Sequence, residues 1–431
     1  MQFKPYPLYI PCDIHWFNEI PQSWKQVRVE QYLIKKDENI GDLWDSTQLL
    51  SLTQNGIIEK DINDGKGKTH SDYSTYQAID IGDLVFCLFD IDETPRTIGL
   101  STKQGMITSA YTAFKSKKNI NTQYLYYFFE SLDDAKALKP YYKGLRKTVR
   151  PPEFLKIHVP FPPKVEQDVI SQFLDTETSR IDNLIAKQEK LIELLEEQRK
   201  SIISYTVTKG LDPNAPMKDS NVEWLGEVPE HWDVKNYRFA SKIYRGKFGH
   251  RPRNDPSLYD GEYPFIQTGD VARAGKYIQT YSQTLNEKGK AVSQVFTSGT
   301  LVMAIAANIG DTAILNFEAY APDSVVGFKP HKNIDLEFLR FSFIASLQAL
   351  KQTAVQSTQA NLNVERIGAL KTTFPPLSEQ IEISNYLNAE NEKINHLISK
   401  QNQLIGKLKE YRSSIISHAV TGKIDVREFS A

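Results

Sequence analysis

Two long stretches of this chain carry large, mostly apolar side chains at every seventh position, with polar residues between them. The row in the first stretch is Leu174, Ile181, Gln188, Leu195 and Ile202, and the row in the second is Leu387, Ile394, Gln401, Leu408 and Ile415. A second seam row is formed by Leu184 and Leu191, and in the other stretch by Leu397 and Leu404. No proline interrupts either pattern, so the spacing predicts two coiled-coil helices of roughly 60 Å each.

The two stretches are copies of one another. Residues 161–212 and 374–425 align without a gap at a constant offset of 213 residues, and about half of the positions are identical. Two copies of one helix can pair antiparallel about an approximate two-fold axis, and such a repeat dominates the architecture. Gln188 and Gln401 lie near the helix midpoints, so we expect them to come together near the axis and fix the helix register. The alternative is that each glutamine faces solvent.

A further apolar row lies beside the predicted seam. It consists of Ile185 and Ile192 in the first helix and of Ile398 and Ile405 in the second. A seam for one partner helix does not need this extra row, whereas a wider stripe is typical of helices in a bundle. We therefore predict that these isoleucines form a docking surface for another subunit.

The remaining segments predict mixed α/β domains. Each combines Gly-, Asn- and Asp-containing turns with a short apolar run typical of a strand and an aromatic-rich helix pattern. The predicted strands are 81–89 and 300–307, and the predicted helices are 122–131 and 335–350. The fold class is therefore α+β, with two mixed domains separated by two long antiparallel coiled-coil helices in a pseudo-two-fold repeat. The predicted bounds are 1–160 and 213–373 for the domains, and 161–212 and 374–425 for the helices.

Composition narrows the class of protein. The net charge is −1 and the two cysteines, Cys12 and Cys87, belong to no metal-binding pattern, which favours a reducing compartment and argues against structural zinc. The sequence contains no apolar run of the roughly 20 residues that a membrane span needs, and its start does not resemble a signal peptide. We expect a soluble cytoplasmic protein with no membrane partner.

Catalytic motifs are missing from the sequence. Residues 65–69 read GKGKT, but a phosphate-binding loop would need a glycine at the position of Ile62. No adenine-methyltransferase, dinucleotide-binding, zinc-protease or serine-hydrolase motif is present. We therefore predict neither a catalytic residue nor a metal site in this chain.

Basic residues gather in a different loop of each domain. Glycines in these loops allow a phosphate backbone to approach closely, and arginine, glutamine and asparagine can pair with base edges. The candidate contacts to double-stranded DNA are Lys143, Arg146, Lys147, Arg150, Arg245, Lys247, Arg251, Arg253, Gln359 and Asn361. The alternative is that these are solvated loops without a ligand.

Short motifs repeat together with the helices. The pattern W-x-x-x-x-P-x-x-W occupies residues 16–24 and 224–232, F-P-P-x-x-E-Q begins at Phe161 and Phe374, and S-I-I-S begins at Ser201 and Ser414. These motifs, in an alternating order of domains and helices over the whole chain, resemble the specificity subunit of type I restriction-modification systems.

The resemblance implies a role that the residues alone do not give. In that family the subunit is not catalytic, and each target recognition domain reads one half of a split, asymmetric DNA sequence. The helices act as a spacer and hold two modification subunits, which use S-adenosylmethionine to methylate adenine, while restriction subunits add an ATP- and Mg-dependent endonuclease. The resemblance thus implies no cofactor in this chain and target recognition domains at 1–160 and 213–373.

Three other functions would share some of these features. A coiled-coil scaffold or adaptor would have the same helices without specific DNA binding. The recognition part of a single-chain restriction-methylase would need methyltransferase motifs, which are missing. A protein that mimics DNA to block restriction would need a strongly negative charge, and the net charge of −1 argues against it.

Overall fold

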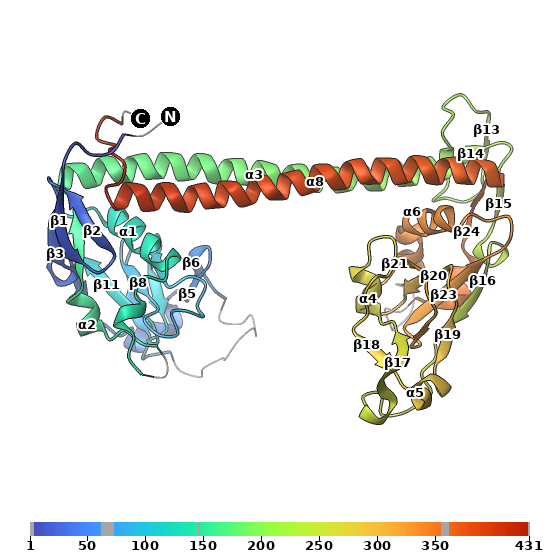
Figure 1. Cartoon of the computed structure of the whole chain (residues 1–431), viewed down its shortest axis with the longest axis horizontal. Coiled ribbons are helices and arrows are strands. Elements are labelled where there is room, and N and C mark those ends of the chain that lie inside the picture. Colours follow the sequence, from blue (N-terminus) through green and yellow to red (C-terminus); the bar gives the residue numbers. More distant parts are fainter. Residues whose placement is uncertain (1–3, 62–72, 145–146, 355–361, 430–431) are drawn as a thin grey trace. The chain divides into compact units, whose positions relative to one another are not determined.

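The computed structural model describes residues 4–61, 73–144, 147–354 and 362–429 (Figure 1). The chain divides into two compact units. The first combines residues 1–188 with residues 402–431, and the second consists of residues 189–401. The division passes after Gln188 and after Gln401, so each long helix contributes one part to each unit.

The first domain precedes the first long helix. Its central antiparallel sheet has the strand order β4-β11-β8-β9. A hairpin of β5 and β6 is joined to the β10-β7 pair by a parallel bridge between Leu49 and Met106. The elements are β1 (Tyr9–Ile14), β2 (Phe17–Pro21), β3 (Lys25–Arg28), β4 (Leu33–Lys35), β5 (Leu50–Thr53), β6 (Gly56–Glu59), β7 (Gln77–Ile79), β8 (Leu84–Phe86), β9 (Ile98–Leu100), β10 (Gly105–Ile107), β11 (Thr112–Ser116), α1 (Thr122–Asp134), α2 (Pro151–Leu155) and β12 (His158–Phe161).

The second domain lies between the long helices in the sequence. Its central antiparallel sheet has the order β16-β23-β20-β21, and a second sheet has the order β18-β17-β22-β19. The elements are β13 (Met217–Asp219), β14 (Glu227–Pro229), β15 (Asp233–Asn236), β16 (Ser241–Arg245), β17 (Tyr259–Phe265), α4 (Thr268–Arg273), β18 (Gln283–Leu285), α5 (Glu287–Ala291), β19 (Gln294–Phe296), β20 (Thr300–Ala304), β21 (Thr312–Leu315), β22 (Ala319–Ala321), β23 (Val325–Pro330), α6 (Leu336–Ala354), α7 (Val364–Ala369) and β24 (Lys371–Phe374).

The two domains share one topology. Their central sheets have matching strand orders, and the parallel pairing of β17 with β22 through Phe265 and Tyr320 matches the Leu49–Met106 bridge. In both domains the strand that leads into a long helix, β12 or β24, pairs antiparallel with β3 or β15. The predicted internal repeat and the predicted strands and helices are therefore confirmed, although the loops differ in length and sequence.

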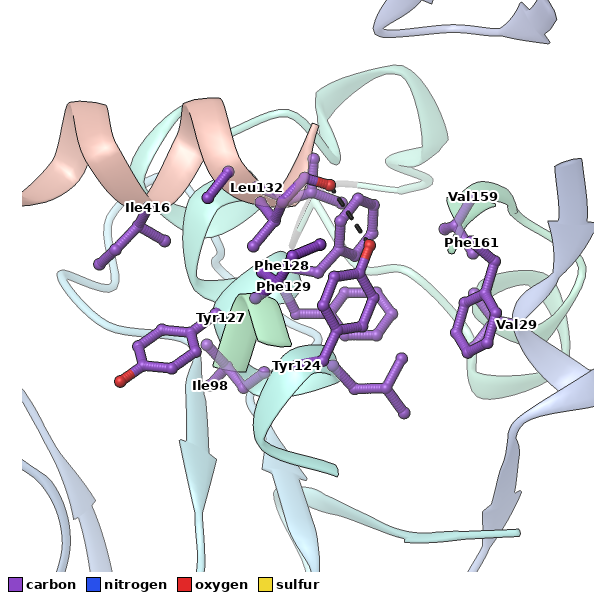
Figure 2. Close-up of a cluster of buried hydrophobic side chains, with 14 of the residues drawn as sticks. Val29, Ile98, Tyr124, Tyr127, Phe128, Phe129, Leu132, Val159, Phe161 and Ile416 are labelled. Carbon is purple, nitrogen blue, oxygen red and sulfur yellow. Dashed lines mark hydrogen bonds between the residues drawn. The ribbon is translucent and has the colours of Figure 1, made fainter. Parts of the chain in front are cut away.

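The central strands are apolar because both of their faces are covered. Every residue of β8 and β20 is buried. In the first domain, the rings of Phe86, Phe114, Phe129 and Phe154 pack with centroids 4.9–5.5 Å apart, and each buried ring stabilises the fold by ~1.5–3 kcal/mol. Figure 2 shows that the aromatic side chains of α1 lie close to Ile416, so the core of the first unit extends onto a long helix.

The long helices are α3 (Lys164–Lys209) and α8 (Leu377–Val420), with 46 and 44 residues. At 1.5 Å per residue they are roughly 65–70 Å long. They pair antiparallel within each unit. Arg412 Nε donates to Asp182 Oδ1 at 3.1 Å in the first unit, and Arg199 Nη2 donates to Asn395 Oδ1 at 2.6 Å in the second.

The predicted seam is confirmed for one row and wrong for part of the other. Buried residues of the first row are Leu174, Ile181, Leu195, Leu387, Ile394 and Ile415. In the other row, Leu191, Leu397 and Leu404 are exposed by 39–42%. The heptad pattern defines the apolar stripe, but the rotation of each helix about its axis decides which side of the stripe is covered.

The four isoleucines predicted to dock another subunit do not form an open surface. Ile405 is buried, Ile185 packs against the core of the first unit, and Ile192 and Ile398 are half-buried. Ile405 is covered within the chain itself, and the docking role of the four isoleucines stays a prediction. Gln188 and Gln401 are both half-buried and belong to different units, so their approach to one another stays a prediction.

Two further expectations concern membranes and metals. In the described part of the chain, no helix is long and apolar enough to cross a membrane. Nor do the described residues contain a group of three or more His, Cys, Asp or Glu side chains that could hold a metal ion. Cys12 and Cys87 are free thiols, and Cys87 is buried.

Candidate nucleic-acid interface

A tryptophan fixes each domain to the start of a long helix. Trp24 Nε1 donates to Glu166 Oε1 at 2.9 Å, and Trp232 Nε1 donates to Glu379 Oε1 at 3.0 Å. Trp24, Trp232 and Glu166 are buried. The second tryptophan of the W-x-x-x-x-P-x-x-W motif and the glutamate of the F-P-P-x-x-E-Q motif are therefore the two sides of one contact.

The glutamine after that glutamate makes a second contact to the domain. Gln167 Oε1 accepts from the Asn121 backbone N–H at 3.0 Å, and Gln380 Oε1 accepts from the Asp335 N–H at 2.9 Å. Asn121 caps the N-terminus of α1, and the Asp335 carboxylate accepts from the Phe338 N–H at the start of α6. The paired Glu-Gln motif thus holds the tryptophan of each domain together with the start of α1 in the first domain and of α6 in the second.

The far end of the other long helix completes each unit. Gly210 follows α3 and Gly422 follows α8, both with the positive φ that favours glycine. A Cβ at Gly210 would lie 3.1 Å from the ring of Trp232, and one at Gly422 would lie 3.3 Å from the ring of Trp24. Each domain is therefore anchored by the start of one long helix and the end of the other.

The basic loops lie at the opposite edge of each central sheet. Strands β8 and β20 run antiparallel to β11 and β23, which lead toward Asn121 and Asp335 at the long helices. We call the edge where β11 and β23 finish the helix end, and the edge where β8 and β20 finish the loop end. Val149 N donates to Leu88 O at 2.9 Å just after β8, and the corresponding bond in the second domain joins Leu362 N to Ile305 O.

In the second domain, the predicted DNA contacts lie on the loop that leaves β16 at the loop end. Arg245, Lys247, Arg251 and Arg253 are all exposed. Arg251 Nη1 donates to the Phe248 and His250 carbonyls, both at 2.8 Å. Arg245 and Arg253 both bind Asp323, a residue that the sequence did not single out.

In the first domain, the predicted contacts lie between α1 and α2. Lys143 pairs with Glu153, and Lys147 Nζ lies 3.2 Å from Asp92 Oδ2. Arg150, the residue immediately before α2, is exposed. The predicted contacts Arg146, Gln359 and Asn361, and the rejected phosphate-loop segment 65–69, lie outside the described residues.

Sequence reasoning missed the acidic partners of these cations. Asp92 lies 3.7 Å from Lys139 Nζ and accepts from the Tyr142 hydroxyl at 3.1 Å. Burial raises the pKa of Tyr142, and the neighbouring Asp92 carboxylate raises it further, so the phenol stays a proton donor. No local pattern joins Asp92 or Asp323 to the basic residues, since the fold alone brings them together.

The geometry supports binding to an anion rather than a reaction. Exposed guanidinium and ammonium groups surround the loop end of each domain, where they can reach phosphates and base edges. The acidic side chains beside them, Asp92 and Asp323, are single carboxylates that already pair with basic residues. The arrangement offers neither a nucleophile beside a base nor a metal-binding cluster among the described residues.

Comparison with known proteins points the same way. The family model for the type I restriction modification DNA specificity domain matches residues 100–196 and 241–406. The putative type I restriction enzyme MjaX specificity subunit of Methanocaldococcus jannaschii is 25% identical over 407 residues, which is 92% of this chain and 88% of that protein. The MjaVIII specificity subunit of the same organism is 25% identical over 343 residues, 76% of each chain.

Solved structures share the fold. A chain from a structure on the complex assembly and conformational transition of a type I R-M system superposes with a TM-score of 0.70 at 14% identity, covering 94% of this chain and 99% of that one. The HsdS subunit from Thermoanaerobacter tengcongensis superposes with a TM-score of 0.51 at 15% identity, covering 94% and 98%.

Proposed function

This chain belongs to the type I restriction modification DNA specificity family, and from that premise we propose that each of its domains reads one half of a split DNA target. The chain recognises DNA sequence and is not itself catalytic, as specificity subunits of type I restriction-modification systems are.

The observation that carries the proposal is the contrast between the two ends of each domain. The helix end repeats the same tryptophan, glutamate and glutamine contacts in both domains. The loop end carries exposed basic residues in both, but on different loops with different sequences. Unlike loops on like scaffolds favour two different half-sites, and hence a target that is not a palindrome.

We assign the partners by chemistry. Two modification subunits that use S-adenosylmethionine would methylate adenine, and restriction subunits that use ATP and Mg would cleave DNA, in the cytoplasm. The α3–α8 pair would carry the modification subunits and set the separation of the half-sites. Its exposed leucines, Leu191, Leu194 and Leu397, fit an apolar contact better than the covered Ile405 does.

The docking assignment has a direct test. Replacing Leu194 and Leu397 together by lysine should weaken capture of the modification subunit at least tenfold in a pull-down titration, because charges would enter an apolar contact. Leu8→Lys, at a residue that is 62% exposed near the N-terminus, is the control and should leave capture unchanged. Equal capture by all three proteins would reject this docking surface.

Sequencing of methylated bases tests the function as a whole. Cells would carry this chain with its modification subunit, and the same cells without this chain would serve as the control. We expect one split motif with methyladenine in both halves. A symmetric, uninterrupted motif, or no motif that depends on this chain, would contradict the proposal.

A further inference from the structure

One aspartate, Asp323, binds two arginines at the loop end of the second domain, one through its carboxylate and one through its backbone carbonyl. Both oxygens of Asp323 accept from Arg253 Nη2 at 2.7 Å. The backbone carbonyl of the same residue accepts from Arg245 Nε at 2.5 Å. Asp323 lies on the turn between β22 and β23, far in sequence from either arginine.

The backbone fixes this arrangement. Gly246 N donates to Val325 O at 2.8 Å and Lys247 N donates to Ala321 O at 3.0 Å, so the basic loop is tied to both sides of the turn. A Cβ at Gly246 would lie 2.0 Å from the Pro322 carbonyl oxygen, which only glycine allows. These backbone contacts therefore fix the position of Asp323 beside the two arginines.

The first domain reaches the same arrangement from a different loop. Asp92, between β8 and β9, lies 3.2 Å from Lys147 Nζ and 3.7 Å from Lys139 Nζ, and the Tyr142 hydroxyl donates to it. Asp92 follows β8 and Asp323 follows β22, which are not equivalent strands of the shared topology. The two acids are therefore not copies of one ancestral residue. In each domain one carboxylate pairs with a cation that the proposed function assigns to DNA, Lys147 in the first domain and Arg253 in the second.

Stability does not account for these pairs. The side chains of Lys139, Lys147 and Arg253 are 61%, 45% and 47% exposed, and exposed ion pairs contribute little to folding. A carboxylate on these cations does compete with DNA phosphate, which supplies nearly all of the attraction in sequence-independent binding. On the cognate sequence, a base edge can also pair bidentately with arginine, so the cation gains a contact that the phosphates of any sequence do not supply.

Resting on the proposed function, we propose that Asp92 and Asp323 are internal competitors of DNA phosphate that weaken binding to non-cognate sequences. On non-cognate DNA the cations stay on their carboxylates. On the cognate site the base contacts draw them away. The two acids thus widen the difference between cognate and non-cognate affinity.

The test uses the complex of the full chain with its modification subunits. Fluorescence anisotropy would measure its affinity for two labelled duplexes across a series of salt concentrations. The cognate duplex carries the motif that sequencing of methylated bases identifies, and the shuffled duplex carries the same bases in a different order. The variants are Asp323→Asn and Asp92→Asn. The control is Asp233→Asn, which makes the same charge change at an exposed residue of β15, paired with Lys235 and leading toward the helix end.

We expect each test variant to bind the shuffled duplex about 3–10-fold more tightly, with a steeper salt dependence of about one additional ion for each cation released. Binding to the cognate duplex should change less, so the specificity ratio falls. The control should match the wild-type complex. Unchanged or weaker binding to the shuffled duplex, or equal tightening by Asp233→Asn, would overturn the inference.

Two further variants separate this inference from the proposed function. Arg253→Ala and Lys147→Ala should weaken DNA binding if the loop ends contact DNA. If they do so while the aspartate variants have no effect, the competitor role alone is rejected. If all of these variants bind DNA as the wild type does, the loop ends are not the DNA-binding surface. Thermal melting and co-purification of the modification subunits verify that each variant folds and assembles.

Discussion

The two domains of this chain are alike where they meet the long helices and unlike where they face away from them. At the helix end, Trp24 and Trp232 make the same hydrogen bond to Glu166 and Glu379. At the loop end, one domain carries its cations after α1 and the other carries them after β16. A constant attachment thus leaves the distal loops free to differ, and substitutions at the two ends should have separable effects.

The largest effect is expected at the helix end. Trp232→Ala removes a fully buried ring and leaves Glu379 without its indole partner, so it should lower the free energy of unfolding of the second unit by about 3–5 kcal/mol. Calorimetric unfolding of the full chain measures this. Phe239→Ala is the control, since that ring is 65% exposed. Equal losses in both variants would break the assignment of Trp232 as an anchor.

An ion pair at the junction of α1 with the long helices distinguishes the two units. In the first unit, Arg412 lies 3.4 Å from the buried Glu130 and 3.1 Å from Asp182. Arg412→Leu should cost about 3 kcal/mol in unfolding free energy, because Glu130 loses a counter-charge in a buried site. The matched variant is Arg199→Leu, whose partners are the neutral Asn395 and the exposed Glu196, and it should cost less than about 1 kcal/mol because no buried carboxylate loses its counter-charge. Equal losses would contradict the difference.

The same pair predicts a dependence on pH. Burial raises the pKa of Glu130, while Arg412 and Arg96 oppose that rise. An acid whose folded-state pKa is raised favours folding more as pH falls through that pKa, because the protonated form needs no counter-charge. Without Arg412 the pKa of Glu130 rises further. The unfolding free energy lost in Arg412→Leu should therefore be smaller near pH 5 than near pH 8. A loss that grows on acidification in urea unfolding would refute this.

The third effect belongs to the loop end and should leave stability unchanged. Combining Arg251→Ala with Arg253→Ala should weaken DNA binding by about 1–3 kcal/mol, through lost base or phosphate contacts. The melting temperature and assembly with modification subunits should match the wild type, because both side chains are exposed. Anisotropy with the cognate duplex measures the first outcome, and a change in melting temperature without weaker binding would contradict it.

Periodic and duplicated features could be predicted from the sequence. The seven-residue rows gave the buried Ile181 and Leu195, and the duplicated motifs correctly predicted a repeated architecture. The rotation of each helix about its axis could not be predicted. Leu191 and Ile405 both belong to the apolar stripe, and only the packing in the folded chain leaves the first exposed and buries the second. Asp92 and Asp323 were missed because their partners lie on other loops, and no periodicity records such a contact.

Exchanging a domain tests the central claim most directly. In such a chain, residues 213–373 would be replaced by a second copy of residues 4–160, which keeps the helix-end contacts and gives both loop ends the same sequence. Sequencing of methylated bases in cells that carry it with the modification subunit should find the half-site of the first domain twice, as an inverted repeat. The original asymmetric motif, or no methylation by an assembled complex, would contradict the account.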